Sequence, residues 1–288
     1  MRSDNLTGIL LMIVSMGLFA VEDTFIKLAS QSIPVGEILV FMGAGGIIVF
    51  SMLMVWKNEP FAPKEAFAPM ILGRMASEIV GRVSYSLALA FGSMAVVAAV
   101  LQATPLAVTM GAALMFGEKV GLRRWTAIFV GFAGVLIILR PGLEGFEPAA
   151  LLSIVGMFAL AFRDLATRAA PKMLSNRQLG LYGFVALVPS GLFMLIITGG
   201  WENPLNGAWP HLLGMSVFGI CAYYLVTAAL RIGEVAVVTP FRYSRIIFAL
   251  IISVVVFSEQ LDSFTLVGAA LVIASGLYTM WRENLRQR

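Results

Sequence analysis

The sequence has very little of the chemistry on which most enzymes depend. Its 288 residues include one cysteine, Cys221, and one histidine, His211. A single cysteine excludes an internal disulfide, and neither residue has neighbours that would complete a metal site or a nucleophile–base pair. The sequence also lacks HExxH, CxxC and GxSxG patterns and a phosphate-binding loop. It therefore predicts a protein that is not an enzyme and that has no cofactor or bound metal.

Charged residues are also scarce. They make up 12% of the chain, whereas hydrophobic residues make up 59%, and an ordinary soluble domain has about 25% charged residues. A soluble fold of this size could not bury so much apolar surface, so lipid must form part of the solvent of this protein. We therefore expect an all-α polytopic membrane protein with almost no soluble domain.

Ten stretches are long and apolar enough to be membrane helices, which need about 20 mostly apolar residues. Short links rich in turn-forming and polar residues separate most of them. The first stretch lacks a clear small-residue cleavage site, so we interpret it as a membrane helix and not as a cleaved signal. The candidate segments are 8–28, 35–55, 67–90, 94–116, 122–140, 149–169, 179–199, 210–230, 235–257 and 264–281.

The basic residues predict an orientation, because Lys and Arg favour cytoplasmic ends of membrane helices. With the N-terminus inside, thirteen basic residues fall at cytoplasmic ends, and only Lys27 and Arg140 fall at outer ends. We therefore expect an integral protein of a bacterial-type cytoplasmic (inner) membrane with both termini cytoplasmic. This bias accounts for most of the basic balance of the chain, so no nucleic-acid partner is expected.

An internal repeat appears when the sequence is shifted by 141 residues. The triplet Ala-Val-Val at 95–97 then meets the same triplet at 236–238, and Asp23 meets Asp164 without a gap. Each copy holds five segments, an odd number, so the two copies must cross the membrane in opposite directions. Such inverted repeats are characteristic of secondary transporters, whose site lies near the membrane midplane between the repeats.

The ends of the two copies carry a resemblance to a known family. Both end in similar stretches, "FGEKVGLRRWTAIFVGFAGVLIILRPG" and "FSEQLDSFTLVGAALVIASGLY", although Ser258 stands where the first copy has Gly117. With ten segments in two fives, the chain resembles the drug/metabolite transporter superfamily, and residues 1–142 and 143–288 each resemble an EamA domain. The resemblance implies secondary transport of small metabolites, often amino-acid export. It also implies a central cavity lined mainly by helices 3, 4, 8 and 9, with contributions from helices 1 and 6.

Several charges nevertheless fall inside the apolar segments. Placing an Arg, Lys or Asp at a membrane helix centre costs about 2.5–3.5 kcal/mol, so such residues usually face a partner or a watery cavity. In the stretch "GRMASEIVGR", Arg74, Glu78 and Arg82 are four residues apart and share one helix face. They have two interpretations: structural pairing within the protein, or a cavity-lining site.

The ninth and fourth segments add a second group. Pro240 frees backbone groups that membrane depth tolerates only inside protein or beside water, and Arg242 and Arg245 share a face beside it. In the fourth segment, Gln102 and Pro105 lie in the matching zone, and several aromatic residues complete the candidate pocket. The predicted substrate-binding residues are Glu78, Arg82, Tyr85, Gln102, Tyr224, Phe241, Arg242 and Arg245.

Two acidic residues hold equivalent places in the first and sixth segments. Asp23 lies next to Glu22, and Asp164 lies next to Arg163. These four residues either form ion pairs across the bundle or include a carboxylate that couples transport to protons. Protons are therefore a candidate coupling ion, and structural pairing remains the alternative.

A site with both carboxylates and arginines suits a zwitterion. The arginines would hold a substrate carboxylate, Glu78 or Asp23 would hold its amine, and the aromatic residues would hold its side chain. The favoured function is therefore alternating-access transport of an amino acid, with an aromatic one as a candidate and export as the expected direction. The excess of intramembrane arginine supports an alternative substrate, an organic anion or a nucleotide-like metabolite. A membrane structural subunit is the alternative outside transport. The sequence does not fix an oligomeric state.

Overall fold

The computed structural model describes residues 2–117, 120–141, 147–171, 173–198, 200–203, 207–232 and 235–287. The regular structure within these ranges is entirely helical. The first half comprises α1 (Arg2–Ala29), α2 (Val35–Trp56), the 3-10 turn η1 (Lys64–Phe67), α3 (Pro69–Phe91), α4 (Met94–Leu101), α5 (Thr104–Phe116) and α6 (Leu122–Leu139). The second half comprises α7 (Ala150–Arg168), α8 (Asn176–Thr198), α9 (Trp209–Ile232), α10 (Val235–Val238), the 3-10 turn η2 (Thr239–Tyr243), α11 (Ser244–Phe257) and α12 (Ser263–Gln287).

The helices have the lengths and the apolar character that a bilayer requires. Within the described ranges, nine helical segments are long and apolar enough to cross a membrane. The remaining long helix, α3, has 23 residues and carries the charges of the stretch 73–82. With α3 included, the described chain contains the ten expected segments, which confirms the prediction of an all-α polytopic membrane protein.

Two of the ten segments are broken where the sequence has a proline. The fourth segment is divided into α4 and α5, and Pro105 lies in the first turn of α5. The ninth is divided into α10, η2 and α11, and Pro240 lies at the start of η2. Proline removes a backbone donor and clashes with the preceding turn, so it favours a helix start. Pro189, in contrast, lies inside the unbroken helix α8. The two breaks interrupt the α-helical hydrogen bonding within the fourth and ninth segments.

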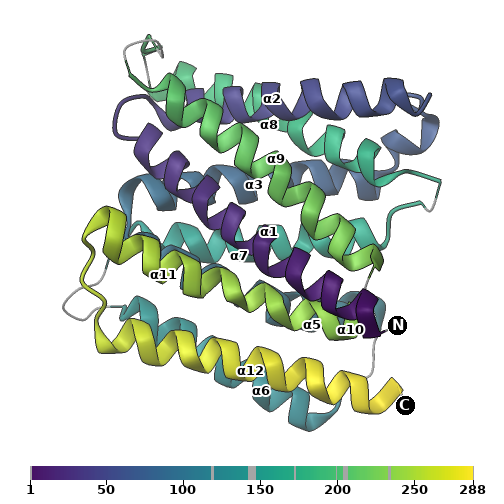
Figure 1. Ribbon diagram of the computed structural model, residues 1–288, viewed down its shortest axis with the longest axis vertical. Helices are drawn as coiled ribbons and strands as arrows, with labels where there is room; N and C mark the ends of the chain where they lie inside the picture. The colour runs from purple at the N-terminus through teal and green to yellow at the C-terminus, as the bar shows by residue number, and fades with distance from the viewer. Residues whose placement is uncertain are drawn as a thin grey trace.

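The long helices form two layers, which Figure 1 shows one behind the other. The nearer layer contains α2, α9, α1, α11 and α12, and the farther layer contains α8, α3, α7, α5 and α6. The principal packing pairs are α1 with α9, α3 with α7, α2 with α8 and α6 with α12. Each pair joins one helix of the first half to one of the second, so neither half forms a separate layer.

The same pairs show the repeat in three dimensions. Helices α2, α3 and α6 begin at residues 35, 69 and 122, and α8, α9 and α12 begin at 176, 209 and 263. Exchanging the two halves maps the α1–α9 pair onto α7–α3 and maps the α2–α8 and α6–α12 pairs onto themselves. This relation is the one that two inverted five-helix repeats require. The predicted boundary between residues 142 and 143 lies outside the described residues, so the division into two domains stays a prediction.

Glycines allow the closest helix approaches. A Cβ atom on Gly36 of α2 would lie 2.7 Å from the carbonyl oxygen of Gly191 on α8. A Cβ atom on Gly134 of α6 would lie 2.8 Å from the carbonyl oxygen of Gly268 on α12. Membrane helices use such small residues to bring backbones together, and here they occur in the two helix pairs that the repeat maps onto themselves.

Both ends of the chain lie on the same side of the bundle (Figure 1). This side is called the terminal side below, and the other is called the opposite side. An even number of crossings between the two termini produces this arrangement, as the count of ten segments predicts.

Candidate functional site

Glu78 is the centre of a group of buried charges between α3 and α7. Its carboxylate lies 3.2 Å from Arg82 Nε, 3.3 Å from Arg163 Nη1 and 4.0 Å from Arg74 Nη2. Arg74 and Arg82 lie one turn to either side of Glu78 on α3, whereas Arg163 comes from α7. The ion pairs of the pairing interpretation are therefore present, with a third arginine from the other half of the chain. That the stretch also lines a cavity stays a prediction.

Two residues of α7 complete this group. Asp164 lies 2.7 Å from Arg163 Nη2, so Arg163 is held between two carboxylates. Thr167 accepts a hydrogen bond from Arg74 Nε at 2.8 Å and donates one to the carbonyl oxygen of Arg163. Sequence reasoning missed Thr167, although its place four residues after Arg163 puts both residues on one helix face.

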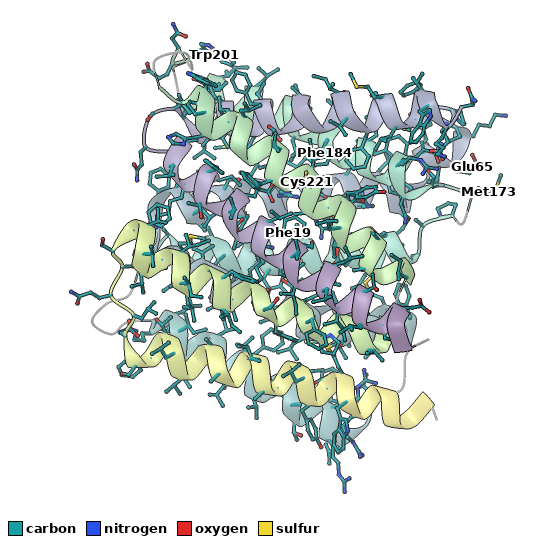
Figure 2. The ribbon with its side chains drawn as sticks, in the orientation of Figure 1. Phe19, Glu65, Met173, Phe184, Trp201 and Cys221 are labelled. Carbon is teal, nitrogen blue, oxygen red and sulfur yellow. The ribbon has the colours of Figure 1, made fainter. Side chains whose placement is uncertain are left out.

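A second charged group joins α1, α3 and α11. Arg245 Nη2 lies 2.7 Å from Asp23 Oδ2 and donates a hydrogen bond to Tyr85 Oη at 3.2 Å. The guanidinium of Arg245 also lies 5.1 Å from the ring centre of Phe19 and 5.9 Å from that of Tyr85. Phe19 lies near the middle of the bundle (Figure 2). Sequence reasoning missed Phe19, although it stands one turn before Asp23 on the same face of α1.

Glu22 and Arg82 bring the two groups next to each other, because Glu22 pairs with Arg82 and directly precedes Asp23 on α1. Arg82 Nη1 lies 3.8 Å from Glu22 Oε1 while Arg82 Nε holds Glu78. Among the described residues, Glu22 makes no hydrogen bond, and its side chain is 5% exposed. Its carboxylate covers Gly219 of α9, where an added Cβ atom would lie 2.5 Å from Glu22 Oε1.

Together these two groups make up a set of buried and half-buried charges, which we call the charged core. It contains four carboxylates and four arginines, so their formal charges cancel. All eight side chains are buried or half-buried. The charged core consists of Glu22, Asp23, Arg74, Glu78, Arg82, Arg163, Asp164 and Arg245. Such charges inside a membrane bundle generally mark a transport pathway or a relay.

The other predicted site residues lie around or outside this core. Gln102 Nε2 donates a hydrogen bond to the backbone oxygen of Arg242 at 3.0 Å, which links the two helix breaks. The Arg242 side chain forms no ion pair with any described residue. Tyr224 is 68% exposed on α9, and Phe241 is 36% exposed. The structure therefore brings Glu78, Arg82, Tyr85 and Arg245 together, but it does not bring Tyr224 or Phe241 to them.

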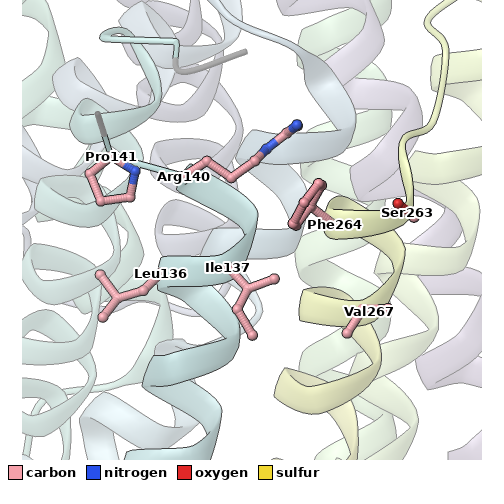
Figure 3. Close-up of a pocket in the computed structure, with 7 residues that line it drawn as sticks. All are labelled: Leu136, Ile137, Arg140, Pro141, Ser263, Phe264 and Val267. Atoms are coloured by element: carbon pink, nitrogen blue, oxygen red, sulfur yellow. The ribbon is translucent and has the colours of Figure 1, made fainter. Parts of the chain in front are cut away.

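A separate groove lies between α6 and α12 on the opposite side (Figure 3). Its volume is about 520 Å³, and it is lined by Leu136, Ile137, Arg140, Pro141, Ser263, Phe264 and Val267. Arg140 pairs with Asp262 and lies over the ring of Phe264 at 5.0 Å. No residue of the charged core lines this mainly apolar groove, which lies between the two helices at the edge of the bundle.

Comparison with known proteins agrees with this architecture. The model of a family described as the EamA-like transporter family matches the chain twice, at residues 6–140 and 147–281. The chain belongs to the EamA-like transporter family. This membership confirms the resemblance found in the sequence, and it agrees with the integral membrane protein that the apolar helices indicate. Members of the family and the named relatives are transporters, not enzymes.

Three relatives show how varied the cargo of similar proteins is. A riboflavin transporter of Vibrio cholerae is 28% identical over 193 residues, which cover 66% of this chain and 64% of that protein. An S-adenosylmethionine uptake transporter of Rickettsia prowazekii is 20% identical over 97% of this chain and 94% of its own length. The pseudopaline exporter CntI of Pseudomonas aeruginosa is 23% identical over 93% of this chain and 94% of its own length.

A solved crystal structure has the same fold. It aligns over 99% of both chains with a TM-score of 0.64 and 16% sequence identity. The likeness supports the arrangement of helices described above. The names of the three relatives cover both uptake and export, so neither they nor the fold assigns a substrate or a direction to this chain.

Proposed function

We propose that this protein is a secondary-active exporter of zwitterionic metabolites, with amino acids as the first candidates. The observation that supports the proposal is the equal number of carboxylates and arginines in the charged core. The core takes side chains from α1, α3, α7 and α11, and therefore from both halves of the chain. A site between inverted repeats can open to one side or the other by rocking of the halves, which is alternating access.

A zwitterion suits the core because it can replace an ion pair without leaving a charge alone. If a substrate enters between Asp23 and Arg245, its ammonium takes the place of Arg245 and its carboxylate takes the place of Asp23. An anion would instead leave one carboxylate of the core without a cation. An uncompensated buried charge costs several kcal/mol, so the balance favours a zwitterion over an organic anion.

The surroundings of Arg245 favour an aromatic group on the substrate. Phe19 and Tyr85 already lie against the Arg245 guanidinium, and aromatic rings accept both cations and other rings on their faces. The relatives support a broad substrate class, since S-adenosylmethionine carries an amino group, a carboxylate and an aromatic base. Riboflavin is aromatic without being an amino acid. The part of the proposed site that binds aromatic rings would therefore suit more of these substrates than the part that binds the charges of an amino acid.

Glu22 is the best candidate for coupling transport to protons. Its nearest described cation is Arg82 at 3.8 Å, whereas Asp23 and Asp164 each have an arginine at 2.7 Å. The charged groups around Glu22 are Asp23 on its own helix, Arg82 on α3 and Arg245 on α11, and α9 presents Gly219. A carboxylate that binds either a proton or the substrate ammonium would make the two exclude each other, which couples export to proton entry.

The predicted orientation is part of the same proposal. Both ends of the chain lie on the terminal side (Figure 1), and the basic residues of the sequence favour that side as cytoplasmic. Substrate would then enter the charged core from the terminal side and leave by the opposite side of a bacterial-type inner membrane.

Counterflow in proteoliposomes tests the substrate class. Vesicles are loaded with an unlabelled compound, and entry of the labelled compound is followed for neutral and aromatic amino acids, organic anions and nucleotides. We expect exchange of amino acids, with a fall of at least about tenfold in Asp23→Asn and in Arg245→Gln, because each change leaves one buried charge unpaired. Arg245→Lys keeps the charge and should retain more activity than Arg245→Gln.

Arg242→Gln provides the matched comparison, since Arg242 lies three residues from Arg245 and has no described ion pair. A smaller loss in Arg242→Gln than in Arg245→Gln would support the site seen in the structure. Exchange of anions or nucleotides only, abolished by Arg242→Gln, would reject the zwitterion and support the alternative substrate class. The absence of exchange for every compound in well-folded protein would favour a structural subunit.

A further inference from the structure

The carboxylate of Glu259 is held by donors from three separate parts of the chain. It accepts hydrogen bonds from Lys27 Nζ at 2.6 Å and Ser93 Oγ at 2.7 Å. The backbone N–H groups of Met94 and Ala95 donate to it at 2.9 and 3.2 Å, and the Ser253 hydroxyl completes the set. A single glutamate therefore joins the end of α1, the start of α4 and the end of α11.

These contacts all lie on the opposite side of the bundle. Glu259 follows α11 in the turn before α12, and Lys27 lies in the last turn of α1. Lys27 Nζ also donates to the carbonyl oxygen of Gly92 at 2.8 Å. Glu259 comes from the second half of the chain, whereas Lys27 and Ser93 come from the first half.

Physical chemistry makes this contact strong. The first N–H groups of a helix lack helical partners and attract anions, so Glu259 caps α4 across the boundary between the halves. Burial alone would raise the pKa of Glu259, but hydrogen bonds from Lys27, Ser253 and Ser93 outweigh it and lower the pKa to about 2. The carboxylate therefore stays charged at physiological pH.

A left-handed turn at Ser258 directs the chain just before Glu259. Ser258 adopts the left-handed conformation with a φ of 53°, as Gly117 does with a φ of 65° at the end of α5. Few residues other than glycine adopt this conformation without strain. The strained turn directly precedes Glu259, whose N–H also donates to the carbonyl oxygen of Ser253.

We propose that Glu259 is a latch that holds the opposite side of the transporter closed. The helices that it joins, α1, α4 and α11, carry or adjoin the charged core through Asp23, Gln102 and Arg245. To open the core toward the opposite side, α11 must separate from α1 and α4, and this movement breaks the bonds to Lys27, Ser93 and the start of α4. The state described here is therefore closed on that side.

The repeat shows that the latch is not symmetric in chemistry. The shift of 141 residues places Glu118 at the position of Glu259, Arg168 at that of Lys27 and Glu234 at that of Ser93. The side chains of these three residues lie outside the described part of the chain. At the level of sequence, the serine that donates to Glu259 is replaced by a carboxylate, which has no proton to donate when ionised. The two halves therefore differ in sequence at this position.

Cysteine accessibility tests the latch without any substrate. Cys221→Ser provides a background without cysteine, and two reporters are placed along the broken fourth segment. Ala98→Cys lies one turn inside α4 from the latch, and Ala107→Cys lies on α5 toward the terminal side. Both alanines are buried. The rate of labelling by a water-soluble maleimide is then measured for protein in lipid nanodiscs, where both sides meet the reagent.

Loss of the latch should change the two reporters in opposite directions. In Glu259→Gln we expect labelling at Ala98→Cys to rise by about tenfold, because the neutral amide loses the charge-assisted hydrogen bonds that hold the closed state. Labelling at Ala107→Cys should fall, since opening of one side closes the other. Ser93→Ala should give a smaller shift of the same sign, and Ser93→Thr, which keeps the hydroxyl, should restore the original ratio.

Glu59→Gln is the matched control on the terminal side. Glu59 accepts hydrogen bonds from Ser175 Oγ at 2.6 Å and from Arg177 Nε at 3.0 Å, so its loss also removes a well-bonded carboxylate from a turn. This variant should not raise labelling at Ala98→Cys. If Glu259→Gln raised labelling at both reporters, or if Glu59→Gln gave the same change as Glu259→Gln, Glu259 would be a structural cap and the latch would be rejected.

The latch rests on the alternating access proposed above but not on the choice of substrate. Opposite changes at the two reporters would establish both the latch and the alternation, whatever compound the protein carries. Unchanged labelling at both reporters in folded Glu259→Gln protein would reject the latch and leave the counterflow result standing.

Discussion

The pairs α3–α7 and α1–α9 are equivalent in the repeat, yet their chemistry differs. Where α7 presents Arg163 to Glu78 of α3 at 3.3 Å, the shift of 141 residues places Glu22 on α1 opposite Gly219 on α9. Glu22 does lie against Gly219, so the geometry of the contact is kept while the ion pair is absent. The α3–α7 pair thus contains an ion pair between its two helices, which we call the clamp. The α1–α9 pair instead has Glu22, whose nearest described cation is Arg82 of α3 at 3.8 Å.

This difference suggests a division of labour between the two halves. A helix pair that holds a buried ion pair resists movement, because separation would leave charges alone in a medium of low dielectric constant. Glu22 beside Gly219 has no ion pair to α9 that would have to break, and under the proposed function it would bind a proton or an ammonium group. We therefore expect α3–α7 to act as the rigid side of the core and α1–α9 as its responsive side.

The largest expected effect comes from breaking the clamp. Glu78→Gln would leave Arg74, Arg82 and Arg163 with less opposing charge, and removal of one partner of a buried pair typically costs about 3–5 kcal/mol. We expect a marked fall in the thermal unfolding midpoint of the purified protein in detergent. Glu22→Gln, measured in the same detergent, should lower the midpoint much less. Equal losses in the two variants would refute the distinction between the two helix pairs.

The second prediction concerns the pH dependence of the stability that Glu259 contributes. The pKa of Glu259 is lowered from 4.5 to about 2 in the folded protein, so the stabilisation is fully present above about pH 4.5 and is lost as pH falls toward 2. At about 1.4 kcal/mol per pKa unit, it amounts to about 3 kcal/mol near neutral pH. The difference in stability between the unsubstituted protein and Glu259→Gln should therefore be constant from pH 8 to pH 5 and shrink below pH 4.5. A difference that persists unchanged at pH 3 would contradict this account.

The third prediction compares two glycines that face the two acidic residues. A Cβ atom on Gly219 would lie 2.5 Å from Glu22 Oε1, whereas one on Gly183 would lie 3.4 Å from Glu78 Oε2. Gly219→Ala must displace Glu22 and should cost about 1–2 kcal/mol, together with a change in the pH profile of transport. Gly183→Ala makes an ordinary contact with Glu78 and should leave that profile as it is. A shifted pH profile in Gly183→Ala alone would reverse the roles of the two helix pairs.

The smallest expected effect concerns the turn that differs between the two halves. Ser258 holds a φ of 53° where its counterpart Gly117 holds 65°. Ser258→Gly removes the steric penalty of the left-handed conformation but adds freedom to the unfolded chain, so a net gain of about 0.5 kcal/mol is expected. The thermal unfolding midpoint should rise by a degree or two, and Gly117→Ser should lower it. A fall in Ser258→Gly would show that the serine hydroxyl has a role of its own in this turn.

Much of the fold could be predicted because its signals are local. The apolar runs located the ten segments, and Pro105 and Pro240 marked the places where the fourth and ninth are broken. The site was less predictable. Glu78, Arg82, Tyr85 and Arg245 do lie together, but Tyr224 and Phe241 are exposed and do not join them. Aromatic residues occur on lipid-facing and cavity-facing helix surfaces alike, so their presence in a segment does not show which way they face.

By itself, the sequence determined that this chain is an integral membrane protein, that it has two halves of opposite orientation, and that charges lie within the apolar segments. These features can be read from the sequence because hydropathy and proline act through neighbouring residues, and the repeat shows as one constant spacing along the chain. Only the tertiary structure decided that Arg245 pairs with Asp23, that Arg163 rather than a residue of α3 alone completes the clamp on Glu78, and that Glu259 reaches the start of α4. These partners are 222, 85 and 165 residues apart. Their meeting depends on how packed helices are rotated about their axes, which no local pattern encodes.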